Sequence, residues 1–185
     1  MNFSHDFPFP EPREQQKAAI SAGIEALLNS DKRFFVLEAG TGVGKSAIGL
    51  TIASYISRHL GSEEEFKSGA YYLTTQKILQ QQYVDDFGNT SHCMRDLKSS
   101  SNYTCSFQGN ISCGEGLRAL KVAKKNSDFF HHCIRSCVYK QAKQSFIDGR
   151  HGITNFSYFL AETQYAGKLE PRDVLVVDEA HNIES

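Results

Sequence analysis

Residues 38–46 read Glu38-Ala39-Gly40-Thr41-Gly42-Val43-Gly44-Lys45-Ser46. Glycines at this density let successive backbone N–H groups point towards one anion, and a helix that begins at Lys45 would add the positive end of its dipole. A polyphosphate matches that arrangement. The segment therefore predicts a phosphate-binding loop between a strand and a helix, with ATP as its ligand. Its expected nucleotide-binding residues are Ala39, Gly40, Thr41, Gly42, Val43, Gly44, Lys45 and Ser46.

Two side chains of this loop carry the predicted chemistry. Lys45 would meet the outer phosphates as a point charge, and the Ser46 hydroxyl would coordinate a Mg²⁺ ion that bridges the same phosphates. The strictest phosphate-loop pattern has glycine at the position of Ala39, so the match is close but incomplete. The alternative interpretation is a glycine turn with a purely structural role.

The segments around the loop alternate between strand and helix patterns. Short apolar runs predict strands at 34–37, 70–74, 152–154 and 174–177. Helical spacing of apolar residues predicts helices at 13–28, 45–60, 78–87, 115–125 and 139–147. Such alternation is typical of a parallel sheet. We therefore expect an α/β fold, a RecA-like phosphate-loop domain interrupted by a small cysteine-rich insertion.

The last predicted strand runs into Asp178-Glu179-Ala180-His181. Parallel sheets bind their ligands at the carboxyl ends of the strands, so we expect this acidic pair to lie beside the phosphate loop. Asp178 would hold Mg²⁺, Glu179 would orient and deprotonate the attacking water, and His181 would sense the nucleotide state. Taken alone, the motif is also compatible with an acidic surface turn or the start of a metal site.

Length and composition are those of a globular domain. The chain has 185 residues, of which 40% are hydrophobic and 22% charged, and this length fits one domain with an insertion. A net charge of -1 gives no global attraction to nucleic acid, so a basic surface has to be local. Neither a signal peptide nor a membrane-spanning apolar run is evident. We therefore expect an intracellular protein, cytoplasmic if prokaryotic or viral, with no membrane partner.

Four cysteines have a spacing that suggests a metal centre. Cys105, Cys113, Cys133 and Cys137 are separated by 7, 19 and 3 residues. Four thiolates can surround zinc or bind the corners of a 4Fe-4S cluster. Only the last pair approaches the spacing of a zinc knuckle, so the cluster is favoured. Zinc and chance free thiols are the alternatives.

Nearby residues offer weaker ligand candidates. His92, His131 and His132 could bind metal, but histidines beside a basic helix more often face solvent or contact phosphate. Cys93 is the fifth cysteine and is expected to be an inert spare thiol.

A basic stretch predicts a local nucleic-acid surface. Between Leu117 and Phe146 seven Lys or Arg residues accompany one acidic residue, Asp128. A solvated helix face is the alternative. The expected DNA contacts in this stretch are Lys121, Lys124, Lys125 and Arg135.

The order of these motifs resembles that of the superfamily 2 iron-sulfur DNA helicases of the XPD and DinG type, over essentially the whole chain. Residues 7–16 are similar to the adenine-reading lead-in of that family; Gln16 takes the place of its adenine-contacting glutamine, and Arg13 belongs to the same segment. Residues 72–76, with Gln80 to Tyr83 beyond them, resemble a motif that touches the backbone of the tracking strand. This likeness implies DNA contacts by Thr74 and Thr75.

The resemblance carries further expectations. It implies single-stranded or forked DNA as the partner, movement from 5′ to 3′, and a 4Fe-4S domain that acts as a wedge at the fork. Two positions depart from the family pattern: Ser101 replaces a basic residue, which weakens one possible DNA contact, and Phe156 replaces a tyrosine.

The expected domain organisation follows from the same likeness. Residues 1–87 would begin the RecA-like domain, 88–138 would form the iron-sulfur insertion, and 139–185 would complete the domain. The family carries an Arch insertion and a second RecA-like domain after this point, supplied in cis or in trans. Because the second domain holds an arginine worth about three to five orders of magnitude in rate, we expect this chain alone to bind nucleotide and hydrolyse it poorly. The alternative function is a stand-alone, nucleotide-regulated module that binds single-stranded DNA.

Overall fold

A four-stranded parallel sheet organises the computed structural model, which describes residues 1–60, 67–166 and 169–182. The strand order is β2-β3-β1-β4, and each neighbouring pair is parallel. The strands are β1 (Lys67–Thr74), β2 (Arg95–Leu97), β3 (His151–Asn155) and β4 (Arg172–Val177). Three of them confirm the strands predicted at 70–74, 152–154 and 174–177, and the parallel sheet confirms the α/β class and fits a RecA-like domain.

Helices cover both faces of this sheet. Four of them form close to their predicted bounds, namely α1 (Glu14–Leu28), α2 (Lys45–His59), α3 (Lys77–Phe87) and α6 (Val138–Asp148). The others are α4 (Cys113–Leu120), α5 (Asp128–Arg135) and α7 (Phe156–Ala161). Short turns of 3-10 helix lie at Ser100–Asn102 and Ala180–Asn182, and a π-helical turn lies at Glu162–Ala166.

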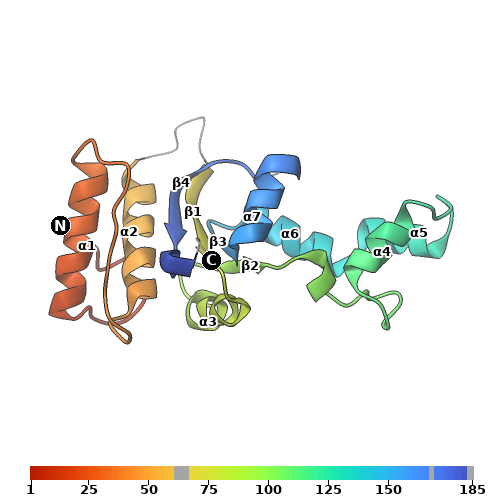
Figure 1. The fold of residues 1–185 in the computed structure, drawn as a ribbon, viewed down its shortest axis with the longest axis horizontal. Coiled ribbons are helices and arrows are strands. Elements are labelled where there is room, and N and C mark those ends of the chain that lie inside the picture. The colour runs from red at the N-terminus through yellow and green to blue at the C-terminus, as the bar shows by residue number, and fades with distance from the viewer. Residues whose placement is uncertain (61–66, 167–168, 183–185) are drawn as a thin grey trace.

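The central strand β1 shows how the two faces are built. Successive strand residues point to opposite faces of a sheet. Ala70 and Tyr72 accordingly join the core formed with α2 and α3, whereas Tyr71 packs with Phe146 of α6 on the other face. The helix α2 packs against β1 and β4, with α1 on its outer side (Figure 1). The carboxyl ends of β1 and β4 thereby lie beside the beginning of α2.

The strand predicted at 34–37 does not form. Phe35 and Leu37 pack against the core shared by α1 and α2, but Phe34 and Val36 are 86% and 88% exposed. A strand requires a neighbour that completes its backbone hydrogen bonds. In the described part of the chain β4 pairs only with β1, so residues 34–37 remain without a ladder despite their apolar composition.

The helix predicted at 115–125 also has different bounds. It begins earlier, because the Ser112 hydroxyl accepts a hydrogen bond from the Glu115 backbone and the Glu115 carboxylate accepts one from the Ser112 backbone. It ends at Leu120, and Val122 beyond it is 87% exposed, so nothing in the core holds a further turn. The strand β2 lies within the range expected for the insertion, yet it pairs with β3 in the main sheet.

Residues 98–137 form a projection that we call the cysteine extension. Figure 1 shows α4 and α5 extending away from the sheet at the end opposite α1. Its buried residues are Cys105, Cys113, Gly116, Cys133 and Cys137. The extension therefore has cysteine side chains where the rest of the fold has apolar ones. No helix in residues 1–60, 67–166 and 169–182 has the length and apolar character needed to cross a membrane.

Candidate nucleotide site and cysteine cavity

The backbone of the phosphate loop has the conformation that its glycines allow. Gly42 and Gly44 have φ angles of 77° and 85°, in the left-handed region that other residues rarely adopt. Gly44 caps α2, so the unpaired N–H groups of the first turn of that helix face the loop. A methyl group added at Gly40 or Gly42 would meet nothing within 4 Å. The loop thus surrounds open space at a helix N-terminus, which suits an anion.

The Lys45 side chain lies back along this loop. Its ammonium group donates to the carbonyl oxygens of Ala39, at 3.1 Å, and Gly40, at 3.4 Å. Thr41 is exposed, whereas Val43 is half-buried and packs against the core shared by α1 and α2. The loop is therefore anchored at Val43 and accessible at Thr41, with one positive charge held beside its open space.

The lead-in segment reaches the same loop. Gln16, at the start of α1, donates from Nε2 to the Val43 carbonyl oxygen at 2.9 Å, and its Oε1 accepts from the Arg13 backbone at 2.9 Å. The Arg13 guanidinium donates to the Gly42 carbonyl oxygen at 3.4 Å. Gln16 is buried and Arg13 is exposed. The structure therefore brings both predicted residues to the loop from a distant part of the sequence.

The acidic pair lies at the carboxyl end of β4. The Asp178 backbone N–H donates to the Leu73 carbonyl oxygen of β1 at 2.8 Å, which fixes its position relative to the neighbouring strand. Its carboxylate accepts hydrogen bonds from the Tyr83 hydroxyl, at 2.9 Å, and from the Glu179 backbone, at 3.0 Å. Asp178 is half-buried, and each of its carboxylate oxygens has one hydrogen-bond donor.

Tyr83 of α3 connects the acidic pair to the phosphate loop. Burial, and then the Asp178 carboxylate, raise the pKa of the Tyr83 phenol, whereas the nearby Ser46 side chain lowers it. The same phenol thus lies beside both Ser46 and Asp178. Sequence reasoning placed Tyr83 on the core face of its helix and in the tracking-strand motif, but it missed the contact with Asp178.

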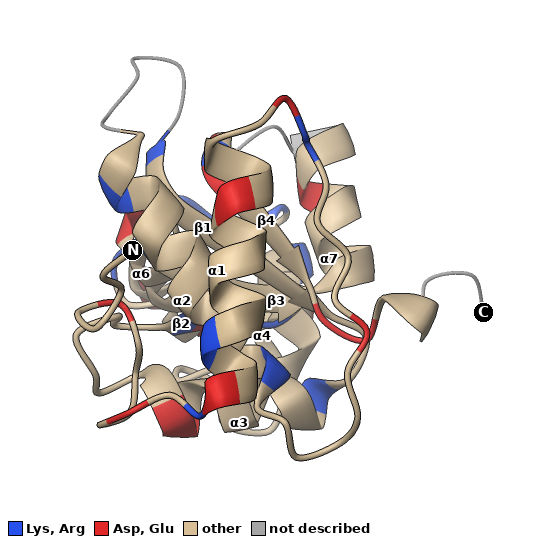
Figure 2. Ribbon diagram, turned by 90° about the vertical axis from the view of Figure 1, so that its left-hand side faces the viewer, with Lys and Arg blue, Asp and Glu red and all other residues tan. Residues whose placement is uncertain are grey.

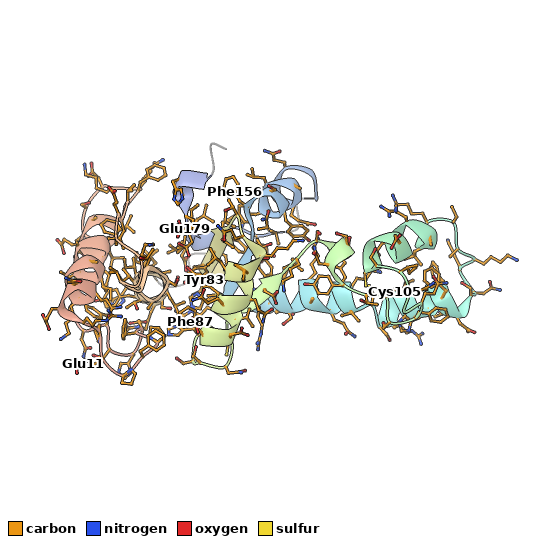
Figure 3. The ribbon with its side chains drawn as sticks, turned by 60° about the horizontal axis from the view of Figure 1, so that its bottom comes forward. Glu11, Tyr83, Phe87, Cys105, Phe156 and Glu179 are labelled. Atoms are coloured by element: carbon orange, nitrogen blue, oxygen red, sulfur yellow. The ribbon has the colours of Figure 1, made fainter. Side chains whose placement is uncertain are left out.

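Glu179 and His181 follow at the surface. Glu179 has a φ angle of 55°, an unusual conformation for a residue other than glycine. Its carboxylate lies 3.3 Å from Nδ1 of His181, which is exposed. Figure 3 labels Tyr83 and Glu179 near each other, with Cys105 far from both on the cysteine extension. The two candidate centres of the chain are therefore spatially separate.

The predicted DNA contacts differ in accessibility. Thr74 is 1% exposed and its hydroxyl accepts a hydrogen bond from the Gln76 backbone at 3.3 Å, so its side chain does not reach the surface. Thr75 is partly exposed. Four basic candidates on the cysteine extension are exposed, namely Lys121, Lys124, Lys125 and Arg135. In contrast, the end of the molecule around α1 carries interspersed positive and negative residues (Figure 2).

The four predicted ligand cysteines line one cavity. Cys105, Cys113, Cys133 and Cys137 are all buried, and with Leu117 they line one small cavity. Cys113 begins α4, Cys133 lies on α5, and Cys137 precedes α6, so three helices converge there. Cys93 is exposed and takes no part.

The thiols of this cavity influence one another. Burial raises the pKa of the Cys113 thiol, and Cys137 and Cys105 raise it further. Burial also raises the pKa of Cys133, with additional contributions from Cys105 and Cys137. A metal that binds neighbouring thiols stabilises their thiolate form.

The cavity does not have the geometry of a single-ion site. Within the described ranges no group of three or more His, Cys, Asp or Glu side chains is close enough to hold one metal ion. Of the histidine candidates, His132 bonds the Ser106 hydroxyl from Nε2 at 2.8 Å and lines the cavity. His131 is exposed, and His92 is buried in the sheet domain.

Comparison with known proteins gives two matches. The family described as Type III restriction enzyme, res subunit, matches residues 9–185. A probable ATP-dependent helicase of Methanocaldococcus jannaschii is 25% identical over 204 aligned positions, which cover 97% of this chain. The chain spans about 30% of the length of that curated relative.

Proposed function

Because the chain belongs to the family described as Type III restriction enzyme, res subunit, which makes it a superfamily 2 helicase domain, we propose that it is the nucleotide-binding part of an ATP-dependent DNA helicase. The observation that carries the proposal is the hydrogen bond from the Tyr83 hydroxyl to the Asp178 carboxylate at 2.9 Å, with the Ser46 side chain close to the same phenol. These residues come from three separate segments, and a magnesium-nucleotide site is the chemistry that requires them together.

The residues present fit a magnesium-bound triphosphate. The open, glycine-lined space at the start of α2 accepts phosphate oxygens, and Lys45 supplies the charge for the outer ones. Ser46 and Asp178 would hold Mg²⁺, which neutralises charge on the transferred phosphate. Glu179 would orient and deprotonate the attacking water, with His181 at its carboxylate. Arg13 and Gln16, which contact the loop, would bind the base side of the nucleotide.

We extend the proposal to a 4Fe-4S cluster held by Cys105, Cys113, Cys133 and Cys137. Their burial around one cavity supports it, because four free cysteines that line one cavity can bind the irons of a cluster as thiolates. Zinc needs four sulfurs at about 2.3 Å from one ion, whereas a cluster binds each thiolate at a different corner and needs a wider space. The sequence spacing of the four cysteines, in which only the last pair approaches a zinc knuckle, favours the cluster.

DNA is the proposed partner of the cysteine extension. Exposed lysines and arginine there, and an exposed Phe107, provide the charge and stacking surface that a single strand requires. The XPD and DinG type of helicase, the 5′ to 3′ direction and the wedge role belong to the proposal through sequence resemblance. A second RecA-like domain, in cis or in trans, would complete the ATPase site.

A titration with a fluorescent ATP analogue tests the nucleotide site. We expect Lys45→Ala to weaken magnesium-dependent binding by about ten- to a hundredfold, the range of a lost charge-assisted hydrogen bond. Lys32→Ala, an exposed lysine ahead of the loop, is the matched control and should bind as the parent does. Circular dichroism should show both variants folded. Equal affinity of the parent and Lys45→Ala would refute the site.

Metal analysis tests the cluster. Protein prepared without oxygen should be coloured and contain iron and acid-labile sulfide. Cys133→Ser should lose the iron, whereas Cys93→Ser, which changes the exposed cysteine outside the cavity, should retain it. Zinc in place of iron in the parent would overturn the cluster and leave the nucleotide site unaffected.

A further inference from the structure

The Asp178 carboxylate is held from two sides. Its Oδ2 accepts from the Tyr83 hydroxyl at 2.9 Å, and its Oδ1 accepts from the Glu179 backbone at 3.0 Å. An ionised carboxylate has about four lone-pair sites, so each oxygen retains capacity for one more partner. The backbone of Asp178 is itself bonded to Leu73 of β1. The side chain is therefore oriented before any ligand binds, with acceptor capacity left over.

The hydroxyl that orients Asp178 comes from a rigid support. Tyr83 is 2% exposed, and its ring lies 5.8 Å from that of Tyr72 and 5.6 Å from that of Phe87, measured between centroids. Its neighbours come from α2, β1 and β3 as well as from α3. Such packing leaves the ring one position, so the direction of the O–H donor is set by the core of the domain.

We propose that Tyr83 is a positioning residue of the magnesium site, which holds the Asp178 carboxylate in the orientation that meets a metal ion beside Ser46. The inference rests on the proposed nucleotide-binding function and deepens it. Donors that orient metal-binding side chains typically account for ten- to a hundredfold in metal affinity or activity. Tyr83 belongs to α3, which begins three residues after Thr74, so the metal site is tied to the helix that follows the proposed DNA-contacting segment.

Tyr83→Phe tests this role, since it removes the hydroxyl and keeps the ring. Binding of the fluorescent ATP analogue is measured as Mg²⁺ is varied, and again with the metal chelated. We expect the Mg²⁺ concentration for half-maximal binding to rise about tenfold or more. Affinity in the absence of metal, and the melting temperature, should stay close to those of the parent. A purely structural tyrosine would change the melting temperature and leave the magnesium dependence as it was.

Tyr72→Phe is the matched control. Tyr72 belongs to the same aromatic cluster, and its buried hydroxyl has no hydrogen-bond partner among the residues the structure describes, so its removal should leave the magnesium dependence unchanged. In an Asp178→Asn background, Tyr83→Phe should add no further increase, because the carboxylate through which Tyr83 acts is gone.

The outcomes separate this inference from the proposed function. If the parent and Tyr83→Phe need the same Mg²⁺ concentration for half-maximal nucleotide binding, the positioning role is wrong and the nucleotide site stands. The same conclusion follows if Tyr72→Phe raises that concentration as much as Tyr83→Phe does. If the parent does not bind nucleotide, or if Lys45→Ala binds it as tightly as the parent does, the proposed function fails. The role of Tyr83 then fails with it.

Discussion

The sheet domain and the cysteine extension bury different chemistry. In the sheet domain, α2, β1 and α3 share a core of apolar side chains, among them Leu50, Tyr72 and Phe87. In the cysteine extension, the buried residues are four cysteines and Gly116. Large apolar side chains of the extension, such as Val122 and Ile134, are instead exposed at 87% and 51%.

This difference separates two sources of stability. Burial of apolar surface stabilises the sheet domain by about 25 cal/mol for each Å² removed from water, with no ligand required. The cysteine extension has little such surface to bury, so the proposed cluster would be the main source of its order, as bound metal is in small metal-held domains. The two regions should therefore respond differently to metal removal, to acid and to mutation.

Metal removal should have the largest effect. We expect chelation or oxidative loss of the proposed cluster to cost the cysteine extension on the order of several kcal/mol of local stability. Limited proteolysis and hydrogen exchange should show increased cleavage and exchange within residues 98–137, with β1 and β3 still protected. Equal loss of protection in both regions would show that they unfold as one unit and would remove the distinction.

Acid should act mainly on the sheet domain. Ser54 bonds Nδ1 of His92 at 3.1 Å and Nε2 of His151 at 3.2 Å, within the buried core. Burial, and then the positive charge of Arg150, lower the pKa of His151 to about 3, and burial also lowers the pKa of His92.

The sign of the acid effect follows from these pKa values. Both imidazoles are held neutral in the folded state. Their contribution to the free energy of unfolding is therefore complete above the unfolded pKa of about 6.5 and is lost as pH falls below it. His151 should cost about 1 kcal/mol per pH unit down to about pH 3, and His92 should add to the loss in the same direction. Urea unfolding at pH 7, 6 and 5 measures this loss. His151→Gln should show a shallower decline, and an identical slope would contradict the assignment.

The smallest expected effect lies at the junction of the two regions. The Tyr139 and Tyr158 hydroxyls are 2.7 Å apart, and Tyr158 donates to Glu162 at 2.9 Å, so the helix after Cys137 is linked to α7. Tyr139→Phe removes one of these hydrogen bonds and should cost about 1 kcal/mol. Urea unfolding measures the change, with Tyr72→Phe, whose hydroxyl has no partner in the described residues, as reference. An equal change in the two variants would mean that the link contributes nothing.

Sequence reasoning succeeded where one face of an element is buried. The periodicity of α1, α2 and α3 and the apolar runs of β1 and β4 reflect such burial, and these elements form as predicted. It failed at 34–37, because an apolar run cannot reveal whether a neighbouring strand is present to pair with it. It also missed α5, whose buried position is Cys133, because a cysteine in a polar stretch does not register as a core residue.

For the candidate site, too, some features could be predicted from residue type and others could not. Residue type and spacing were sufficient to predict the glycine-rich loop as a candidate phosphate site, because the conformation of Gly42 and Gly44 and the charge of Lys45 are properties of the residues themselves. The same holds for the four cysteines as a candidate set. Neither prediction required knowledge of any distant part of the chain.

Contacts between distant residues were decided by the tertiary structure alone. The hydrogen bond from Tyr83 to Asp178 joins positions 95 residues apart, and the burial of Thr74 depends on how the sheet is covered. Such relations arise only when helices and strands pack, because a hydrogen bond needs its two atoms within about 3 Å and local patterns carry no information about which segments will meet. The amino-acid order thus determined which groups are present, and the folded chain determined which of them act together.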